Sequence, residues 1–537
     1  MTNRADAGAG YLRPRWIFLR ALGAIFFSAF YSLAFQIHGL IGERGILPAG
    51  QYLTDVAAAA GAARFWYVPS LFWLGAGDRA LTIVVALGLV SSIAIVLNIW
   101  PRLSLVVATL LFLSCVTTLQ DFSSYQSDGM LLEAGAIAVC FAPRGLRPGL
   151  GGGDPPSRIS LFMLRWEWFR IYFESGLVKL MSGDVHWRNF TAMDDYYQNG
   201  PLPAWPGWYV QHFPHWYHAF TVGVTLGIEL FVVWAVFLPR RLRLWCAFGT
   251  TLLQIGIIAT ANYAFLNYLV LMLGVLLVDD RVLQRVALRG RKGAYVIPSE
   301  RQRVEGPPYA EESSSAGTGV PRLARFARSL GMTGGGKGSL GMTRGAVAET
   351  FFLAWIFYAT LWAFLAPGSR SFFAAPERAL EPFRIANAYG LFATMTVARY
   401  EIEFQGTSDG GRTWTVYPFR YKPQDVMERP GVYAPYQPRF EWNLWFASLG
   451  PWQGSPWVVA AQERLVEGSP SVLRLFRRDP FGGHPPAAVR TVLWQYWFTD
   501  WATKRRTGAW WRRQELGVFS GIVQRDSTGK IEFIGAR

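Results

Sequence analysis

Nine apolar segments, each about as long as a bilayer is thick, limit what this chain can fold into. They cover approximately residues 16–37, 79–99, 102–119, 128–142, 159–181, 217–238, 243–260, 264–278 and 347–366. A helix that crosses a bilayer needs about 20 mostly apolar residues, and a few of these segments are shorter than that. Charged residues make up only 16% of the chain, below the roughly 25% of soluble domains. The sequence therefore predicts a polytopic α-helical membrane protein with about nine spans.

The loops between these segments alternate in basic charge. Lys and Arg gather before the first segment, in PRGLRP (143–148), in PRRLR (239–243) and after Asp280, whereas residues 119–128 and 182–216 contain few of them. Short cytoplasmic loops are enriched in Lys and Arg, so we expect a cytoplasmic N-terminus and an extracytoplasmic C-terminal part. The net charge of +16 fits membrane orientation, and no nucleic-acid motif accompanies it, so we expect no nucleic-acid partner.

The hydrophobic pattern divides the chain into four parts. They are a helical bundle at 1–278 with an extracytoplasmic loop at 182–216, a cytoplasmic flexible linker at 279–346, a last transmembrane helix at 347–366, and a β-rich extracytoplasmic domain at 385–537. The linker is Gly- and Ser-rich and buries too little apolar surface to offset its ordering entropy. In the last part, RYEIEF and RTWTVYPFRY flank the turn sequence TSDGG, which predicts a β-hairpin.

Six charged residues lie inside the predicted spans or at their edges. They are Glu133, Glu167, Arg170, Glu174, Lys179 and Glu229. Glu167, Arg170 and Glu174 share one helical face, where Arg170 can pair with either carboxylate. Charges within a bilayer must pair or line a wet cavity, so either an ion-pair network or a polar cavity that handles a substrate or a proton explains them. Lys179 is expected to extend its ammonium group to the interface, since it lies near the end of its span.

The 182–216 loop and the start of the next span concentrate side chains suited to binding a partner. The candidates for this surface are His186, Trp187, Arg188, Asp194, His212 and His215. Pro214 interrupts the helix that a metal-binding histidine stripe would need, so we expect no metal. The three cysteines lie in apolar segments, which argues against disulfides, and no cofactor motif is found, so we expect no cofactor.

Two long blocks of the chain carry a recognisable pattern. The first, LRWEWFRIYFESGLVKLMSGDVHWRNFTAMD, combines an apolar helix that ends in G-x-x-K with W-R-x-x-T-x-M and a later P-x-P segment. The second contains F-R-Y-K-P and P-x-Q-P-R-x-x-W. Both resemble the lipase maturation factor family, and the resemblance covers nearly all of the chain except 282–346. The matching positions are Gly176, Lys179, Trp187, Arg188, Thr191, Met193, Pro201, Pro203, Phe419, Arg420, Tyr421, Lys422, Pro423, Arg439 and Trp442. They are signature positions and not known catalytic residues.

The resemblance implies a membrane protein whose C-terminal domain faces the endoplasmic-reticulum lumen and which assists the folding and assembly of secreted lipases. The Ala-, Gly- and Arg-rich composition indicates a bacterial member of the family in a plasma membrane. The leading hypothesis is a non-enzymatic maturation factor whose extracytoplasmic domain and 182–216 loop hold a client protein. The alternatives are a membrane enzyme distantly similar to vitamin K-dependent carboxylases, with a polar intramembrane cavity, and a transporter. The client and the oligomeric state stay open.

Overall fold

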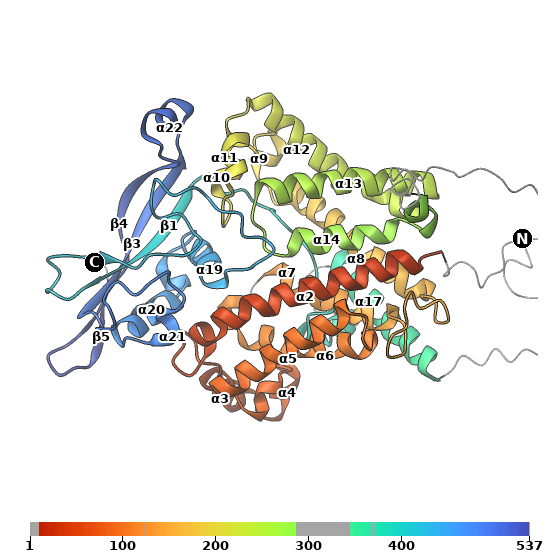
Figure 1. Ribbon diagram of the computed structural model, residues 1–537, viewed down its shortest axis with the longest axis horizontal. Coiled ribbons are helices and arrows are strands. Elements are labelled where there is room, and N and C mark those ends of the chain that lie inside the picture. Colours follow the sequence, from red (N-terminus) through yellow and green to blue (C-terminus); the bar gives the residue numbers. More distant parts are fainter. Residues whose placement is uncertain (1–9, 124, 286–343, 367, 369–370, 536–537) are drawn as a thin grey trace, which may run out of the picture. The chain divides into compact units, whose positions relative to one another are not determined.

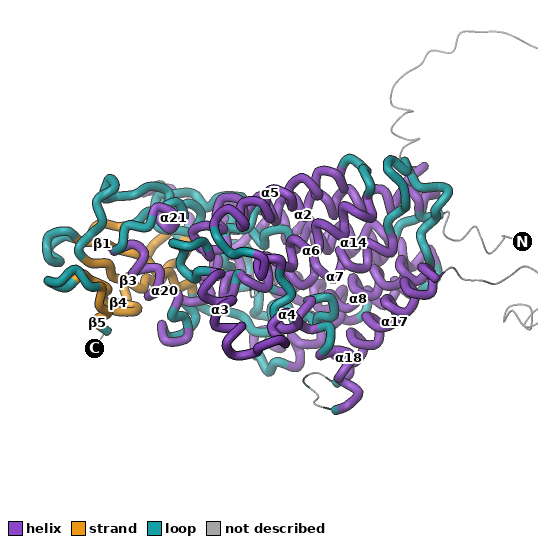
Figure 2. Tube along the Cα trace, turned by 90° about the horizontal axis from the view of Figure 1, so that it is seen from below, coloured by secondary structure: helices purple, strands orange, loops and turns teal. Residues whose placement is uncertain are grey.

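Helices form the first part of the chain and a β-sheet the last. The computed structural model describes residues 10–123, 125–285, 344–366, 368 and 371–535. Figure 1 shows the order of the elements, and Figure 2 shows the strands gathered apart from the long helices. Contacts divide the chain into two units, Met1–Leu283 with Phe352–Arg537, and Gln284–Phe351. Most of the linker predicted at 279–346 lies outside the described residues.

Each of the nine apolar segments predicted from the sequence is helical. The helices are α2 (Leu12–Ile41), α5 (Asp78–Val96), α6 (Pro101–Thr118), α7 (Gln126–Phe141), α8 (Arg158–Met181), α12 (His215–Leu230), α13 (Arg240–Thr260), α14 (Leu266–Gly274) and α17 (Arg344–Leu365). Among the described residues, six are long and apolar enough to cross a membrane: α2, α5, α6, α12 with its extension to Phe237, α13 and α17. The helices α7 and α14 have only 16 and 9 residues, and α8 carries charges along its length. The count of about nine spans is therefore not confirmed.

Shorter helices connect these elements. They are α3 (Ala49–Ala60), α4 (Arg64–Tyr67), α9 (Val185–Arg188), α10 (Tyr196–Asn199), α11 (Trp205–Gln211) and α18 (Ala375–Arg378), with the 3₁₀ turns η1 (Gly61–Ala63), η2 (Leu71–Leu74), η3 (Gln120–Ser123), η4 (Val232–Phe237), η5 (Val275–Leu277), η6 (Phe372–Ala374) and η7 (Glu381–Phe383). Helix α9 begins after Asp184, whose carboxylate accepts a hydrogen bond from the His186 amide at 2.9 Å. The 182–216 loop is thus built largely from short helices.

The C-terminal part contains one five-stranded antiparallel sheet. Its strands are β1 (Arg399–Thr407), β2 (Thr415–Val416), β3 (Ala488–Phe498), β4 (Trp511–Arg525) and β5 (Ile531–Ile534), in the order β2-β1-β3-β4-β5. Its helices are α19 (Arg439–Ala447), α20 (Trp457–Val466), α21 (Pro470–Leu473) and α22 (Trp501–Thr507), with η8 (Trp452–Gly454). The predicted sheet-containing C-terminal part is confirmed.

The hairpin predicted around TSDGG is present, but its second strand is short. Asp409 closes the turn, because its Oδ1 accepts a hydrogen bond from the Thr413 amide at 2.9 Å. Gly410 supplies the left-handed backbone conformation that the turn needs, with a φ of 74°. The second strand ends at Val416, just before Pro418, which has no N–H to donate to a ladder.

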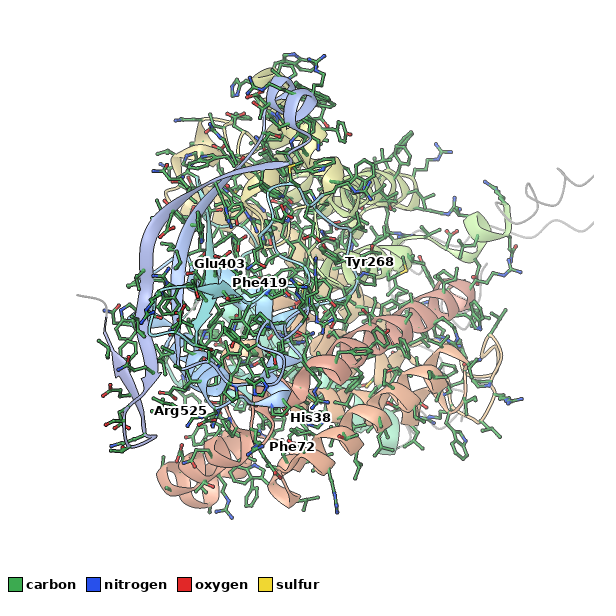
Figure 3. All side chains as sticks on the ribbon, turned by 60° about the vertical axis from the view of Figure 1, so that its left-hand side comes forward. His38, Phe72, Tyr268, Glu403, Phe419 and Arg525 are labelled. Carbon is green, nitrogen blue, oxygen red and sulfur yellow. The ribbon has the colours of Figure 1, made fainter. Side chains whose placement is uncertain are left out.

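An aromatic core joins the sheet to its helices. The ring of Phe476 lies 5.8 Å from that of Phe404 in β1 and 5.3 Å from that of Phe440 in α19, measured between centroids. Phe419, which follows β2, lies 5.5 Å from the same ring. Gln424 connects Phe419 to Glu403 of β1, both labelled in Figure 3, because it accepts a hydrogen bond from the Phe419 amide at 2.9 Å and donates to Glu403 at 3.3 Å. Because each ring buries a large apolar area, this cluster stabilises the packing of α19 on the sheet.

Candidate functional site

Buried charges gather where α7 and α8 pack together. Arg170 of α8 is paired with Glu133 of α7, and both side chains are almost fully buried. The Nη1 atom of Arg170 also lies 3.9 Å from Oε1 of Glu174. The sequence predicted a pair between Arg170 and a carboxylate on its own helix, and Glu174 meets that expectation at longer range. The planar guanidinium group, with several donors, can hold carboxylates from two helices together.

The segment that follows α17 supplies hydrogen bonds to these buried charges. Tyr389 donates its hydroxyl to Glu133 Oε2 at 2.9 Å and its backbone amide to Glu174 Oε2 at 2.6 Å. The side-chain amide of Asn387 donates to the same oxygen of Glu133 at 3.1 Å, and the backbone carbonyl of Asn387 accepts a hydrogen bond from Arg170. We call Glu133, Arg170, Glu174, Asn387 and Tyr389 the polar cluster. The sequence did not point to Asn387 or Tyr389, because they lie in a loop without any periodic pattern.

Glu167 takes no part in these hydrogen bonds. Its side chain is fully buried on α8, and neither carboxyl oxygen has a hydrogen-bond partner among the described residues. The prediction that Arg170 can pair with either neighbouring carboxylate is wrong for Glu167, because the guanidinium group is turned toward Glu133 and Glu174. Burial of a polar side chain that lacks a hydrogen bond costs free energy, a cost that the hydrogen-bonded carboxylates of the polar cluster do not carry.

Lys179 is buried, and the prediction that it extends to the interface is wrong. Its side chain is only 2% exposed, and Nζ lies 2.9 and 2.8 Å from the two carboxyl oxygens of Glu229 on α12. The ammonium group also lies 5.1 Å from the centre of the Trp187 ring. Gly176 permits this contact, because a Cβ atom there would lie 2.8 Å from Cβ of Glu229. The family signature G-x-x-K is therefore the place where α8 and α12 approach closely and share a buried ion pair.

The three predicted histidines of the 182–216 loop each have a separate partner. The Nδ1 atom of His186 lies 2.7 Å from Oδ1 of Asp184, and that of His215 lies 3.0 Å from Oδ1 of Asp194. His212 instead contacts a backbone carbonyl at 2.7 Å. Within the described ranges, no group of three or more His, Cys, Asp and Glu side chains is arranged to hold a metal ion.

Trp187 and Arg188, which were predicted for one surface, have different surroundings. Trp187 is buried, and its indole N–H donates to the carbonyl of Phe392 at 2.9 Å. It anchors the loop and does not face solvent. Arg188 is exposed and donates to the carbonyl of Leu180 at 3.3 Å. From the sequence, a tryptophan in a loop is compatible with a buried anchor and with an exposed contact surface. Trp187 is an anchor because the segment around Phe392, far away in the sequence, packs against it.

Four signature residues of the C-terminal part are buried, namely Phe419, Lys422, Arg439 and Trp442. Arg439 of α19 donates to Asp128 of α7 through both terminal nitrogens, at 2.7 and 2.8 Å, and both side chains are fully buried. Lys422 places Nζ 2.6 Å from Oε2 of Glu401. Trp442 is also buried. Such residues hold the fold together, and the two-point pair between Arg439 and Asp128 fixes α19 against the bundle.

The FRYKP stretch wraps around Glu441 of α19. The carboxylate of Glu441 accepts hydrogen bonds from the backbone amides of Arg420, Tyr421 and Lys422 at 2.8, 2.8 and 2.6 Å. Burial raises the pKa of Glu441 to about 7, although the three amides act in the opposite direction. The sequence analysis did not single out Glu441, since nothing in its local sequence shows that a distant turn meets it.

Aromatic side chains in and next to α11 and α22 form one cluster, of which Trp208 is buried and Trp205, Tyr209 and Trp501 are exposed. We call it the aromatic patch, and it comprises Trp205, Trp208, Tyr209, His212, Trp501 and Trp510. The ring of Trp501 lies 4.7 Å from that of Trp208 and 5.7 Å from that of Tyr209. Trp205, Tyr209 and Trp501 are 37%, 40% and 44% exposed. Figure 1 shows α22 close to α11, so the 182–216 loop and the C-terminal part build this surface together.

Comparison with known proteins finds relatives over nearly the full chain. The model for the lipase maturation factor transmembrane domain matches residues 13–285, and that for the lipase maturation factor C-terminal domain matches residues 385–521. Lipase maturation factor 2 of Gallus gallus is 33% identical, over 95% of this chain and 81% of that protein. The Homo sapiens lipase maturation factor 2 is 31% identical, over 95% and 82%. Lipase maturation factor 1 of Bos taurus is 29% identical, over 98% and 91%. No solved structure matches.

The two matched ranges contain the features described above. The first includes the α8 helix with Lys179, and the second includes Tyr389, the FRYKP stretch and Arg439. The chain belongs to the lipase maturation factor family.

Proposed function

We propose that this chain is a membrane-embedded maturation factor that holds a partly folded client protein and assists its folding without catalysis. Its relatives are named lipase maturation factors, so we propose a secreted, lipase-like client. The aromatic patch is the observation that carries this proposal at the level of geometry. Three of its six side chains, Trp205, Tyr209 and Trp501, are exposed, and the cluster joins the predicted client-facing loop to the C-terminal part.

The chemistry of the patch suits an unfolded or partly folded protein. Exposed aromatic rings offer large apolar contacts with little loss of side-chain entropy. Helix α22 adds Lys504, Arg505 and Arg506, and Nζ of Lys504 lies 3.6 Å from the centre of the Trp510 ring. Cationic groups beside rings can bind acidic and aromatic side chains of a client. No particular client sequence is needed for such contacts.

We also propose nine membrane crossings, with the N-terminus in the cytoplasm and the C-terminal part outside it. The domain limits remain those of the sequence prediction, 1–278, 279–346, 347–366 and 385–537. The contacts of the C-terminal part support this orientation, because it binds the two loops that the charge pattern assigns to the extracytoplasmic side, 119–128 and 182–216, and the chain after the first predicted span. Arg439 binds Asp128, Arg399 donates to the carbonyl of Gln198 at 3.0 Å, and Ser469 donates to that of Arg44 at 2.6 Å.

Two observations point to different cellular membranes for this protein. The composition favours a bacterial plasma membrane, whereas the relatives named above are vertebrate proteins. The proposal for this chain is an integral membrane protein with an extracytoplasmic client site, and the bacterial plasma membrane stays a prediction. The carboxylase-like alternative is not favoured, because the family comparisons identify maturation factors over both parts of the chain.

Serine substitutions in the aromatic patch test the proposal. We expect the double variant Tyr209→Ser/Trp501→Ser to lower the secretion of active lipase roughly tenfold, because exposed aromatic anchors commonly contribute more than about 1 kcal/mol each to binding. The lipase is co-expressed in cells that lack their own lipase maturation factor, and its activity is measured in the medium. The membrane level of the variant is measured in parallel and should not change, since both side chains are partly exposed.

Phe446→Ser is the matched control. Phe446 is also an exposed aromatic residue of the C-terminal part, but it belongs to α19 and not to the patch. Its replacement should leave lipase secretion near the wild-type level. If the patch variant secretes as much active lipase as the control, this surface does not hold the client.

A further inference from the structure

A cavity of about 420 Å³ lies among α8, α12, α13 and α14. Its walls are mostly apolar and include Ile171, Val224, Leu252 and Val270. Val224 of α12 and Leu252 of α13 are exposed, which places an apolar mouth between these two helices. Both are candidate membrane spans. A bilayer would therefore present hydrocarbon chains, and not water, to this opening.

The buried end of the cavity is polar. Lys179 and Glu229 line it as an ion pair, so together they bring no net charge. Gln254 donates to the hydroxyl of Tyr172 at 2.8 Å and accepts a hydrogen bond from Asn267 at 2.7 Å. All five side chains are buried, and each of the four helices contributes at least one. The polar end thus offers hydrogen bonds from several directions without a charge in excess.

Glycines on α13 keep this space open. Gly249 and Gly256 line the cavity two helical turns apart, and a Cβ atom added to either would meet nothing within 4 Å. Helices that pack closely through glycine show the opposite pattern, as Gly176 does against Glu229. Only 22% of the α13 span is buried within the protein, the smallest share of the six candidate spans in the described part of the chain. The glycines therefore leave room for something that the chain itself does not supply.

We infer that this cavity binds a membrane lipid with one apolar chain and an uncharged, hydrogen-bonding end, of the monoacylglycerol type. The acyl chain of the lipid would enter between α12 and α13. The polar end of the lipid would reach Lys179, Glu229 and Gln254, which together carry no net charge. Ligand sites are typically about 300 to 1,000 Å³, mostly apolar, with a few polar groups that fix orientation, and this cavity lies near the lower limit. That size suits one chain better than the two of a phospholipid. The inference does not depend on how a client protein is bound.

A photoreactive lipid tests the inference on the full-length protein in nanodiscs. The probe is a monoacylglycerol with a diazirine in its acyl chain, and the labelled peptides are identified by mass spectrometry. We expect labelling concentrated on α12 and α13 and reduced by excess unlabelled monoacylglycerol. Equal labelling of α2, α5 and α6 would overturn the inference. Equal competition by a fatty acid, which is charged, would overturn the assignment of an uncharged end.

Glycine variants give the decisive comparison. Gly249→Leu should lower labelling of α12 and α13 roughly tenfold, because a side chain in the cavity collides with the lipid chain. Gly227→Leu on α12 is the matched control, since a Cβ there also meets nothing within 4 Å but Gly227 does not line the cavity. Gly249→Ala, a smaller change, should give an intermediate loss at an unchanged melting temperature. Unchanged labelling in the Ala and Leu variants at position 249 would overturn the inference.

Discussion

Apart from Glu167, the buried charged side chains described above have partners on other elements, so removal of one strands another. Arg170→Gln would leave Glu133 without its cation in a low-dielectric setting, which typically costs about 3–5 kcal/mol. We expect a clear fall in the melting temperature in detergent. Arg188→Gln is the control, because Arg188 is exposed and its loss strands no buried charge. If the two variants melt alike, the polar cluster is not structural and the polar-cavity interpretation takes its place.

Glu441 gives the stability of the fold a dependence on pH. Burial raises its pKa from 4.5 to about 7, so the folded state keeps a proton that the unfolded state has released between these values. Stability should therefore fall as the pH rises through this range, by roughly 3 kcal/mol at most. Melting temperatures measured at about pH 5 and about pH 8 should differ less in Glu441→Gln than in the wild type. The control is Glu467→Gln, at a more exposed position, which should behave like the wild type. If Glu441→Gln and the wild type show the same difference between the two pH values, Glu441 does not have this role.

The sequence could predict which charged side chains are buried but not which residues they contact. Glu133, Arg170 and Glu174 stand out because charges in an apolar segment must be paired. Their partners Asn387 and Tyr389 lie more than 200 positions further along, in a loop. Lys179 was misplaced for a related reason. Proximity to a helix end predicts an interfacial ammonium group, and only the tertiary approach of α12 supplies Glu229.

Helices and strands were more predictable than their partners, because local patterns determine them. Apolar length located the long helices, and the β-branched and aromatic run RYEIEF located β1. The turn chemistry of Asp409 and Gly410 identified the hairpin. The number of crossings was not predictable in the same way. Helix α7 is shorter than a lipid-exposed span, and helix α8 is more polar. Burial against other helices allows both to form within the bundle.

The ion pair between α19 and α7 provides a test of how one element is fixed to another. Asp128→Leu and Arg439→Leu each leave a fully buried charge without its partner, which should lower the melting temperature strongly. The double variant removes both charges and should melt above at least one of the single variants, because neither charge is then stranded. This result does not require that the ion pair also makes the fold more specific. Additive losses in the double variant would show that the two side chains act independently.

Across the entire chain, one consistent pattern links the charge of the loops to the contacts of the C-terminal part. The contacts described above involve Arg44, Asp128 and Gln198, each of which follows a segment predicted to run outward. Loops of the basic type, such as 143–148, make none of these contacts. The charge pattern and the tertiary contacts are independent observations. Their agreement favours a C-terminal part that folds against the extracytoplasmic ends of the helices.

Cysteine labelling tests this orientation directly. Ser408 lies exposed in the β1–β2 turn, and Ser408→Cys should react with a membrane-impermeant maleimide in intact cells or spheroplasts. Leu146→Cys, in a basic loop and also exposed, should react only after lysis. The native Cys115, Cys140 and Cys246 are buried, so they contribute little background. Labelling of Leu146→Cys in intact cells, with protection of Ser408→Cys, would reverse the topology and remove the aromatic patch from the compartment in which a secreted client folds.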